Sequence, residues 1–123
     1  MKKFSLVAVF SALLITVRID AGPRVTLHVS PAVAFAPAIL TVRTTIEPSD
    51  DNRMLSIEVD SSTYRRTSEI SLDGKKSQRT SVIELRDVPT GLYEVRAVLV
   101  GSSGPIAKSM QLVEVEPAAG YTR

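Results

Sequence analysis

The sequence predicts an all-β domain in which two antiparallel sheets pack face to face. Apolar and polar residues alternate along most of the chain, and this period of two places one side of each strand on a core and the other in water. The part of the chain after residue 22 shows no helical period of 3.6. Short runs rich in Val, Ile and Thr are divided by Pro, Gly, Asp and Asn at short intervals. About seven strands spaced in this way favour a two-sheet sandwich.

The first three strands have the clearest alternation. Residues 25–29, 40–46 and 55–59 each place Val, Leu or Ile at every second position, with Thr44 taking one of these places, and polar side chains between them. The segment from Pro31 to Pro37 breaks the first connection. These three runs are therefore predicted to lie with one face on the core.

The later strands are less regular. Residues 64–72 are apolar only at their ends, which predicts an edge strand, and residues 79–86 follow after Asp73-Gly74, a typical hairpin turn. Residues 92–100 end in a run that is apolar on both faces, as in a central strand. Residues 106–115 change parity, so we predict a bulge near Gln111.

The first 21 residues have the layout of a secretory signal peptide. Residues 1–3 carry two Lys, residues 4–17 are almost all apolar, and small or polar residues follow. The apolar run stops at Arg18, short of the roughly 20 residues that a membrane span needs. We expect a signal-peptide helix cleaved after Ala21, with an uncleaved anchor as the alternative. The product would be periplasmic or secreted, without membrane contact after cleavage.

Composition excludes several classes of function. Residues 1–21 hold three basic side chains and one acidic one, so the other 102 residues carry twelve of each. This balance argues against general nucleic-acid binding. The chain has no Cys, which excludes disulfides, thiolate zinc sites and cysteine catalysis. We expect one sandwich domain over residues 22–116 and a disordered tail over residues 117–123.

The segment from Leu85 to Ala97 contains the most specific motif. It resembles the entry to strand F of an immunoglobulin-like or fibronectin-type-III-like domain, with Gly91 and Tyr93 at the matching positions. The resemblance implies a tyrosine corner, in which the Tyr hydroxyl binds backbone a few residues upstream. Without the Cys pair and Trp of antibody domains, the chain is similar to disulfide-free bacterial versions. Over residues 30–115 it resembles small exported bacterial domains of unassigned function.

One group of residues is a candidate binding site. If the strands on either side of Asp73-Gly74 were neighbours, cations beside an aromatic ring would gather on one sheet edge, where an acidic surface or polysaccharide could dock. The alternative is that these charges protect an open edge from aggregation. The candidates are Tyr64, Arg65, Arg66, Lys75, Lys76 and Arg79.

Other candidates are weaker. His28, the only His, falls on the polar face of its strand, so neither a metal site nor a catalytic triad has a second member. Asp50-Asp51-Asn52 carries oxygen ligands that suit calcium, but its spacing is that of a turn. We therefore expect no catalytic residues, no metal and no cofactor.

Our leading hypothesis is a non-enzymatic exported interaction module that acts through a protein partner. We expect a monomer in preference to an oligomer. The first alternative is a module that binds carbohydrate or another anionic polymer through Tyr64 and the cations near it. The second is a fibre or adhesin subunit that exchanges strands, although the chain supplies seven strands of its own.

Overall fold

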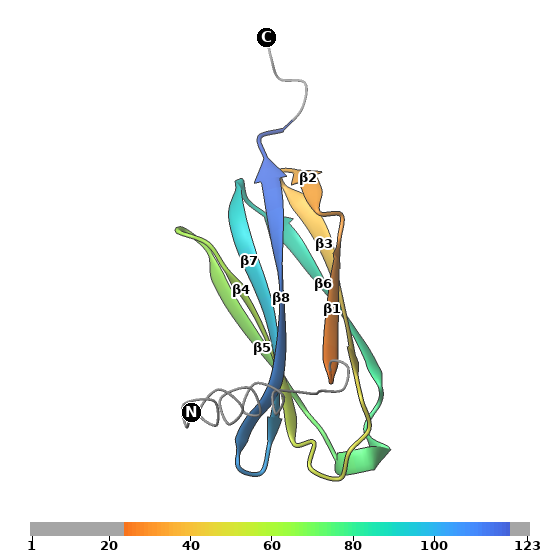
Figure 1. Cartoon of the computed structure of the whole chain (residues 1–123). Helices are drawn as coiled ribbons and strands as arrows, with labels where there is room; N and C mark the ends of the chain where they lie inside the picture. Colours follow the sequence, from red (N-terminus) through yellow and green to blue (C-terminus); the bar gives the residue numbers. More distant parts are fainter. Residues whose placement is uncertain (1–23, 119–123) are drawn as a thin grey trace, which may run out of the picture.

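Eight strands and one short 3-10 helix make up residues 24–118, the part of the chain that the computed structural model describes (Figure 1). The predicted signal peptide and residues 119–123 of the predicted tail lie outside the described residues. Within residues 24–118, no helix is long and apolar enough to cross a membrane. The elements are β1 (Val25–Ser30), β2 (Val33–Phe35), β3 (Ala38–Ile46), β4 (Met54–Asp60), β5 (Arg65–Ser71), η1 (Gly74–Lys76), β6 (Thr80–Val88), β7 (Gly91–Gly101) and β8 (Gly104–Glu116).

The strands form an all-β, immunoglobulin-like sandwich, which confirms the fold predicted from the alternating pattern. One sheet has the order β1-β3-β6 and the other the order β2-β8-β7-β4-β5. Neighbouring strands are antiparallel except β2 and β8, which are parallel. The eighth strand is β2, which forms after Pro31 as the chain passes from the first sheet to the second.

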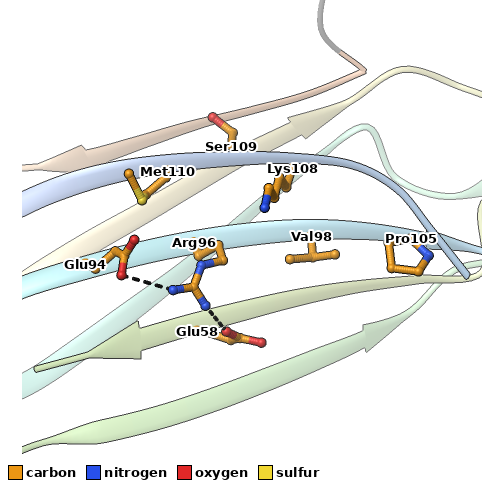
Figure 2. A pocket seen from close by; sticks show the side chains of 8 residues that line it. All are labelled: Glu58, Glu94, Arg96, Val98, Pro105, Lys108, Ser109 and Met110. Atoms are coloured by element: carbon orange, nitrogen blue, oxygen red, sulfur yellow. Dashed lines mark hydrogen bonds and ion pairs between the residues drawn. The ribbon is translucent and has the colours of Figure 1, made fainter.

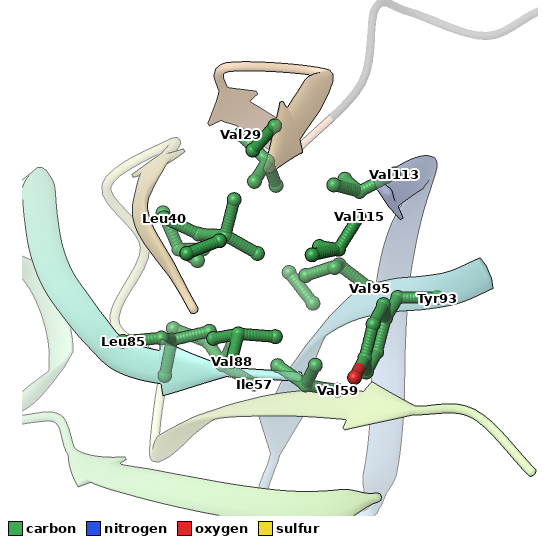
Figure 3. Close-up of a cluster of buried hydrophobic side chains, with 14 of the residues drawn as sticks. Val29, Leu40, Ile57, Val59, Leu85, Val88, Tyr93, Val95, Val113 and Val115 are labelled. Carbon is green, nitrogen blue, oxygen red and sulfur yellow. The ribbon is translucent and has the colours of Figure 1, made fainter. Parts of the chain in front are cut away.

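The core lies between the two sheets, as the period of two requires. On β7, Tyr93, Val95, Ala97 and Leu99 are buried, and the residues between them are partly exposed. Figure 3 shows Tyr93 and Val95 on one side of this core and Leu40 and Leu85 of the opposite sheet on the other. The other buried apolar residues are Val25, Val29, Ala34, Ala38, Leu40, Val42, Ile46, Leu55, Ile57, Val59, Leu85, Val88, Val113 and Val115.

The tyrosine corner that the resemblance implies is present. The hydroxyl of Tyr93 donates a hydrogen bond to the carbonyl oxygen of Pro89 at 2.7 Å, and the Tyr93 side chain is fully buried. A Cβ at Gly91 would lie 3.2 Å from the ring, so a residue without a side chain leaves room for it. Burial raises the pKa of Tyr93, so its hydroxyl stays protonated as a donor.

Two strand positions agree with the sequence, and one connection does not. β5 is an edge strand and β7 lies at the centre of its sheet, as predicted. The predicted hairpin at Asp73-Gly74 is wrong, because β5 and β6 belong to different sheets. A two-residue type I′ turn needs positive φ at both positions, whereas Asp73 has φ −122° and only Gly74 has a positive φ, 56°. The chain enters η1 instead and crosses to the other sheet.

The predicted bulge near Gln111 is also wrong. The pairing of β7 with β8 runs without interruption from Gly91 opposite Val115 to Leu99 opposite Ala107, and the register shifts only beyond Leu99. Parity is conserved because Gln111 occupies an inward position. Its side-chain amide donates to the carbonyl oxygen of Val29 and accepts from the N–H of Val29, both at 2.9 Å.

Candidate binding surface

The outer face of the five-stranded sheet is the side that points away from the core. Because alternate residues of β7 are buried, Leu92, Glu94, Arg96 and Val98 point outwards. The register places Glu114, Leu112, Met110 and Lys108 of β8 opposite these four residues, in that order. The same parity brings Val33 and Phe35 of β2 and Glu58 and Asp60 of β4 onto this face.

An apolar band runs across this outer face. We define it as Val33, Phe35, Leu92, Met110 and Leu112, whose exposed fractions lie between 52% and 67%. Leu112 is central, because Val33 and Leu92 both lie opposite its neighbour Glu114, in positions diagonal to it. Exposed large hydrophobic side chains gathered on one face in this way are typical of interaction sites.

The other side of the sandwich is less apolar. Among residues 24–118, only two further large hydrophobic side chains are more than a third exposed, Ile39 on β3 and Val82 on β6. Both belong to the three-stranded sheet, where Val82 lies opposite Arg43. The concentration of exposed hydrophobics is therefore a property of the outer face of the larger sheet.

An ion-pair cluster lies beside the apolar band. Arg96 donates from Nη1 to Oε1 of Glu58 at 2.5 Å and from Nη2 to Oε1 of Glu94 at 3.0 Å (Figure 2). Desolvation opposes the charge on Arg96, but the Glu94 and Glu58 carboxylates outweigh it and raise the pKa of the guanidinium. Arg96 is thus held by two carboxylates on one side of the band.

The cluster and the band border an open hollow of about 690 Å³ on β4, β7 and β8. Besides the ion-pair residues, Val98, Pro105, Lys108 and Met110 line it, and Figure 2 shows Met110 and Lys108 on β8 along one side. The hollow therefore offers apolar contact with charged groups at its rim.

The cations singled out in the sequence do not form one cluster. Arg65 and Arg66 begin β5, whereas Lys75 and Lys76 lie in η1 beyond the other end of that strand. In Figure 1 the turn from β4 into β5 is at the left, whereas the short helix η1 is at the bottom. A strand of this length separates its ends by about 20 Å. Arg79 lies just before β6, on the other sheet.

Two of these cations also have acidic partners nearby. Arg65 Nε lies 3.1 Å from Oδ1 of Asp60, and Lys75 Nζ lies 3.9 Å from Oδ2 of Asp50. These pairs are exposed, so each adds little to stability. The expected gathering of Arg65, Arg66, Lys75, Lys76 and Arg79 on one edge is not seen, because it depended on the hairpin that the chain does not form.

Tyr64 contributes to the packing of the domain. Its ring meets that of Tyr93 edge to face, with centroids 5.7 Å apart, and it is partly buried against the core. A platform for sugar rings needs an open aromatic face. The contacts of Tyr64 therefore indicate a structural role beside the tyrosine corner more clearly than a role in ligand binding.

The remaining candidates from the sequence are His28 and the turn at Asp50-Asp51-Asn52. His28 is exposed on β1. Within residues 24–118 no three His, Cys, Asp or Glu side chains come together as a metal site would require. Asp51 accepts hydrogen bonds from the Ser102 hydroxyl at 2.6 Å and the Ser102 N–H at 3.2 Å, which lower its pKa. Asn52 is buried and donates to the carbonyl oxygen of Glu47 at 2.9 Å. The turn thus links two loops of the sandwich.

The sequence contained the signal for the apolar band, but our interpretation missed it. Met110 and Leu112 have the parity opposite to Val113 and Val115, and we explained this with a bulge. The simpler explanation is that two large hydrophobic residues face solvent. Leu92 and Val33 show no local signal, because only the sheet topology places them next to Leu112.

Comparison with known proteins shows a similarity of fold alone. No family model and no curated protein sequence matches the chain. The structure is similar to a superoxide reductase (neelaredoxin) from Ignicoccus hospitalis, with a TM-score of 0.57 and 10% identity over 75% of this chain and 80% of that one. It is also similar to a family 76 glycoside hydrolase from a bovine Bacteroides thetaiotaomicron strain, with a TM-score of 0.51 and 17% identity over 73% of this chain and 20% of that one. At such identities the likeness shows a shared fold and no shared activity.

Proposed function

We propose that the chain is a non-enzymatic exported interaction module that binds a protein partner through the outer face of its five-stranded sheet. The observation that carries the proposal is the apolar band, which gathers five of the seven large exposed hydrophobic side chains of residues 24–118 on one face. Water-exposed apolar area of this kind favours association, because covering it removes it from water. The layout of residues 1–21 supports export.

The resemblance of residues 30–115 to small exported bacterial domains agrees with this proposal, and the single His and the lack of Cys support a non-enzymatic role. The alternative of an anionic-polymer module draws less support, because its cations are separated along and beyond β5. We further propose that the module acts as a monomer towards its partner.

Affinity capture from the envelope fraction of the host tests the proposal. The bait is the tagged full chain, and its processed N-terminus is read by mass spectrometry. Leu112→Asn places a polar side chain at the centre of the apolar band, whereas Val82→Asn makes the same type of change at a 56% exposed site on the other sheet. We expect Leu112→Asn to lose a stoichiometric partner that both the unmodified chain and Val82→Asn retain. Equal capture by all three would contradict the proposal.

A further inference from the structure

We infer that the partner presents a cationic amphipathic segment to the outer face, one in which Lys or Arg side chains lie between apolar ones. The inference rests on the proposed function and adds the chemistry of the partner. It depends on the carboxylates that interrupt the apolar band, on the lack of a cationic partner for Glu114 and Glu116 within the described residues, and on the net charge of the face.

Carboxylates alternate with apolar residues on this part of the sheet. Glu114 lies directly between Val33 on one neighbouring strand and Leu92 on the other. Glu94 is opposite Leu112, and Glu116 is opposite Phe35. A segment that covers the band must therefore place its own groups against carboxylates as well as against apolar side chains.

Two of the carboxylates in or beside the band, Glu114 and Glu116, have no cationic partner among the described residues. Glu94 shares Arg96 with Glu58, and Asp60 pairs with Arg65. Glu114 and Glu116 form no ion pair with any residue of the described part of the chain. Apolar contact that buried them without a partner would leave charges desolvated, which is costly. A partner that supplies Lys or Arg at these points avoids that cost.

The charge of the whole face selects the same class of partner. Its carboxylates outnumber its cations by six to three, by the parity of the pairing. The carboxylates are Glu58, Asp60, Glu69, Glu94, Glu114 and Glu116, and the cations are Arg65, Arg96 and Lys108. A negative face repels anionic polysaccharides, nucleic acids and acidic lipid headgroups, and it attracts basic polypeptides.

The first experiment titrates the purified full chain with a short fluorescein-labelled peptide in which Lys and Leu alternate. There are two matched control peptides. The Glu–Leu peptide has Glu in place of every Lys, and the Lys–Ser peptide has Ser in place of every Leu. We expect saturable binding of the Lys–Leu peptide alone, weakening as salt is added because exposed charges are screened. Equal binding of the Lys–Leu and Glu–Leu peptides, or no binding of the Lys–Leu peptide, would overturn the inference.

Two double variants test which carboxylates contribute to binding of the Lys–Leu peptide. Glu114→Gln with Glu116→Gln neutralises the two unpaired carboxylates of the band. Glu47→Gln with Glu84→Gln removes the same charge from exposed positions just after β3 and on β6, at the other sheet. We expect the first double variant to weaken the affinity for the Lys–Leu peptide by about three- to ten-fold at low salt. The control double variant should change this affinity by less than about two-fold.

The outcomes separate the inference from the proposed function. One outcome is that Leu112→Asn loses the captured partner, whereas the double variant Glu114→Gln with Glu116→Gln binds both the peptide and the partner normally. In that case the face is the binding surface, and its carboxylates only keep it soluble. That result overturns the cationic partner alone. If Leu112→Asn retains the partner, the proposed function fails and this inference fails with it.

Discussion

The side chain of Tyr93 packs in the core and also forms a hydrogen bond to the turn that precedes β7. Its ring lies in the core against Tyr64, and its hydroxyl reaches back to Pro89 just before β7 begins. The short motif from Val88 to Tyr93 predicts this contact because its partners are close in sequence, so no knowledge of the sheets is needed. Local contacts of this kind are the part of the structure that the sequence reveals best.

Tyr93→Phe tests the contribution of that hydroxyl. The substitution keeps the ring and leaves the Pro89 carbonyl without its donor, so we expect the free energy of unfolding to fall by about 1–3 kcal/mol. Urea denaturation followed by circular dichroism measures the change. Tyr64→Phe is the control, because the Tyr64 hydroxyl forms no hydrogen bond within residues 24–118. A loss no greater than that of the control would count against the corner.

At the scale of elements, β8 is the strand that the sequence described least well. Its inward residues include Gln111, which local alternation marks as a break in an apolar pattern. The break disappears when β1 is considered, since the Gln111 amide bonds the N–H and carbonyl of Val29, a residue 82 positions away. The side chain thereby takes the place of a strand neighbour at the open edge of β1 and links the two sheets.

Gln111→Leu tests this link between β8 and β1. Leu keeps a similar volume but can neither donate nor accept, so we expect a loss of about 1–2 kcal/mol in the free energy of unfolding. Hydrogen exchange at the Val29 amide should also accelerate relative to the unmodified chain. Ser109→Ala, the preceding inward-facing position on β8, should leave both quantities nearly unchanged. Unaltered exchange at Val29 in Gln111→Leu would show that the amide does not protect β1.

For the whole molecule, the sequence predicts the class of fold but not the partition of strands between sheets. Alternation identified the core faces of β1, β3 and β4, yet the same pattern is compatible with β5 and β6 as a hairpin or as members of different sheets. The candidate cationic site depended on that choice, and the structure separates its members. The apolar band depends on it as well, because Val33, Leu92 and Leu112 come together only through the order β2-β8-β7.

The central claim is that the outer face of the five-stranded sheet contacts a protein partner. The most direct test replaces Leu112 by a photo-activatable phenylalanine analogue and, in a second chain, replaces Val82 in the same way. After irradiation of living host cells, we expect a discrete crosslinked protein from position 112 and none from position 82. Crosslinking from position 82 with none from position 112 would contradict the claim and place the interaction on the opposite sheet.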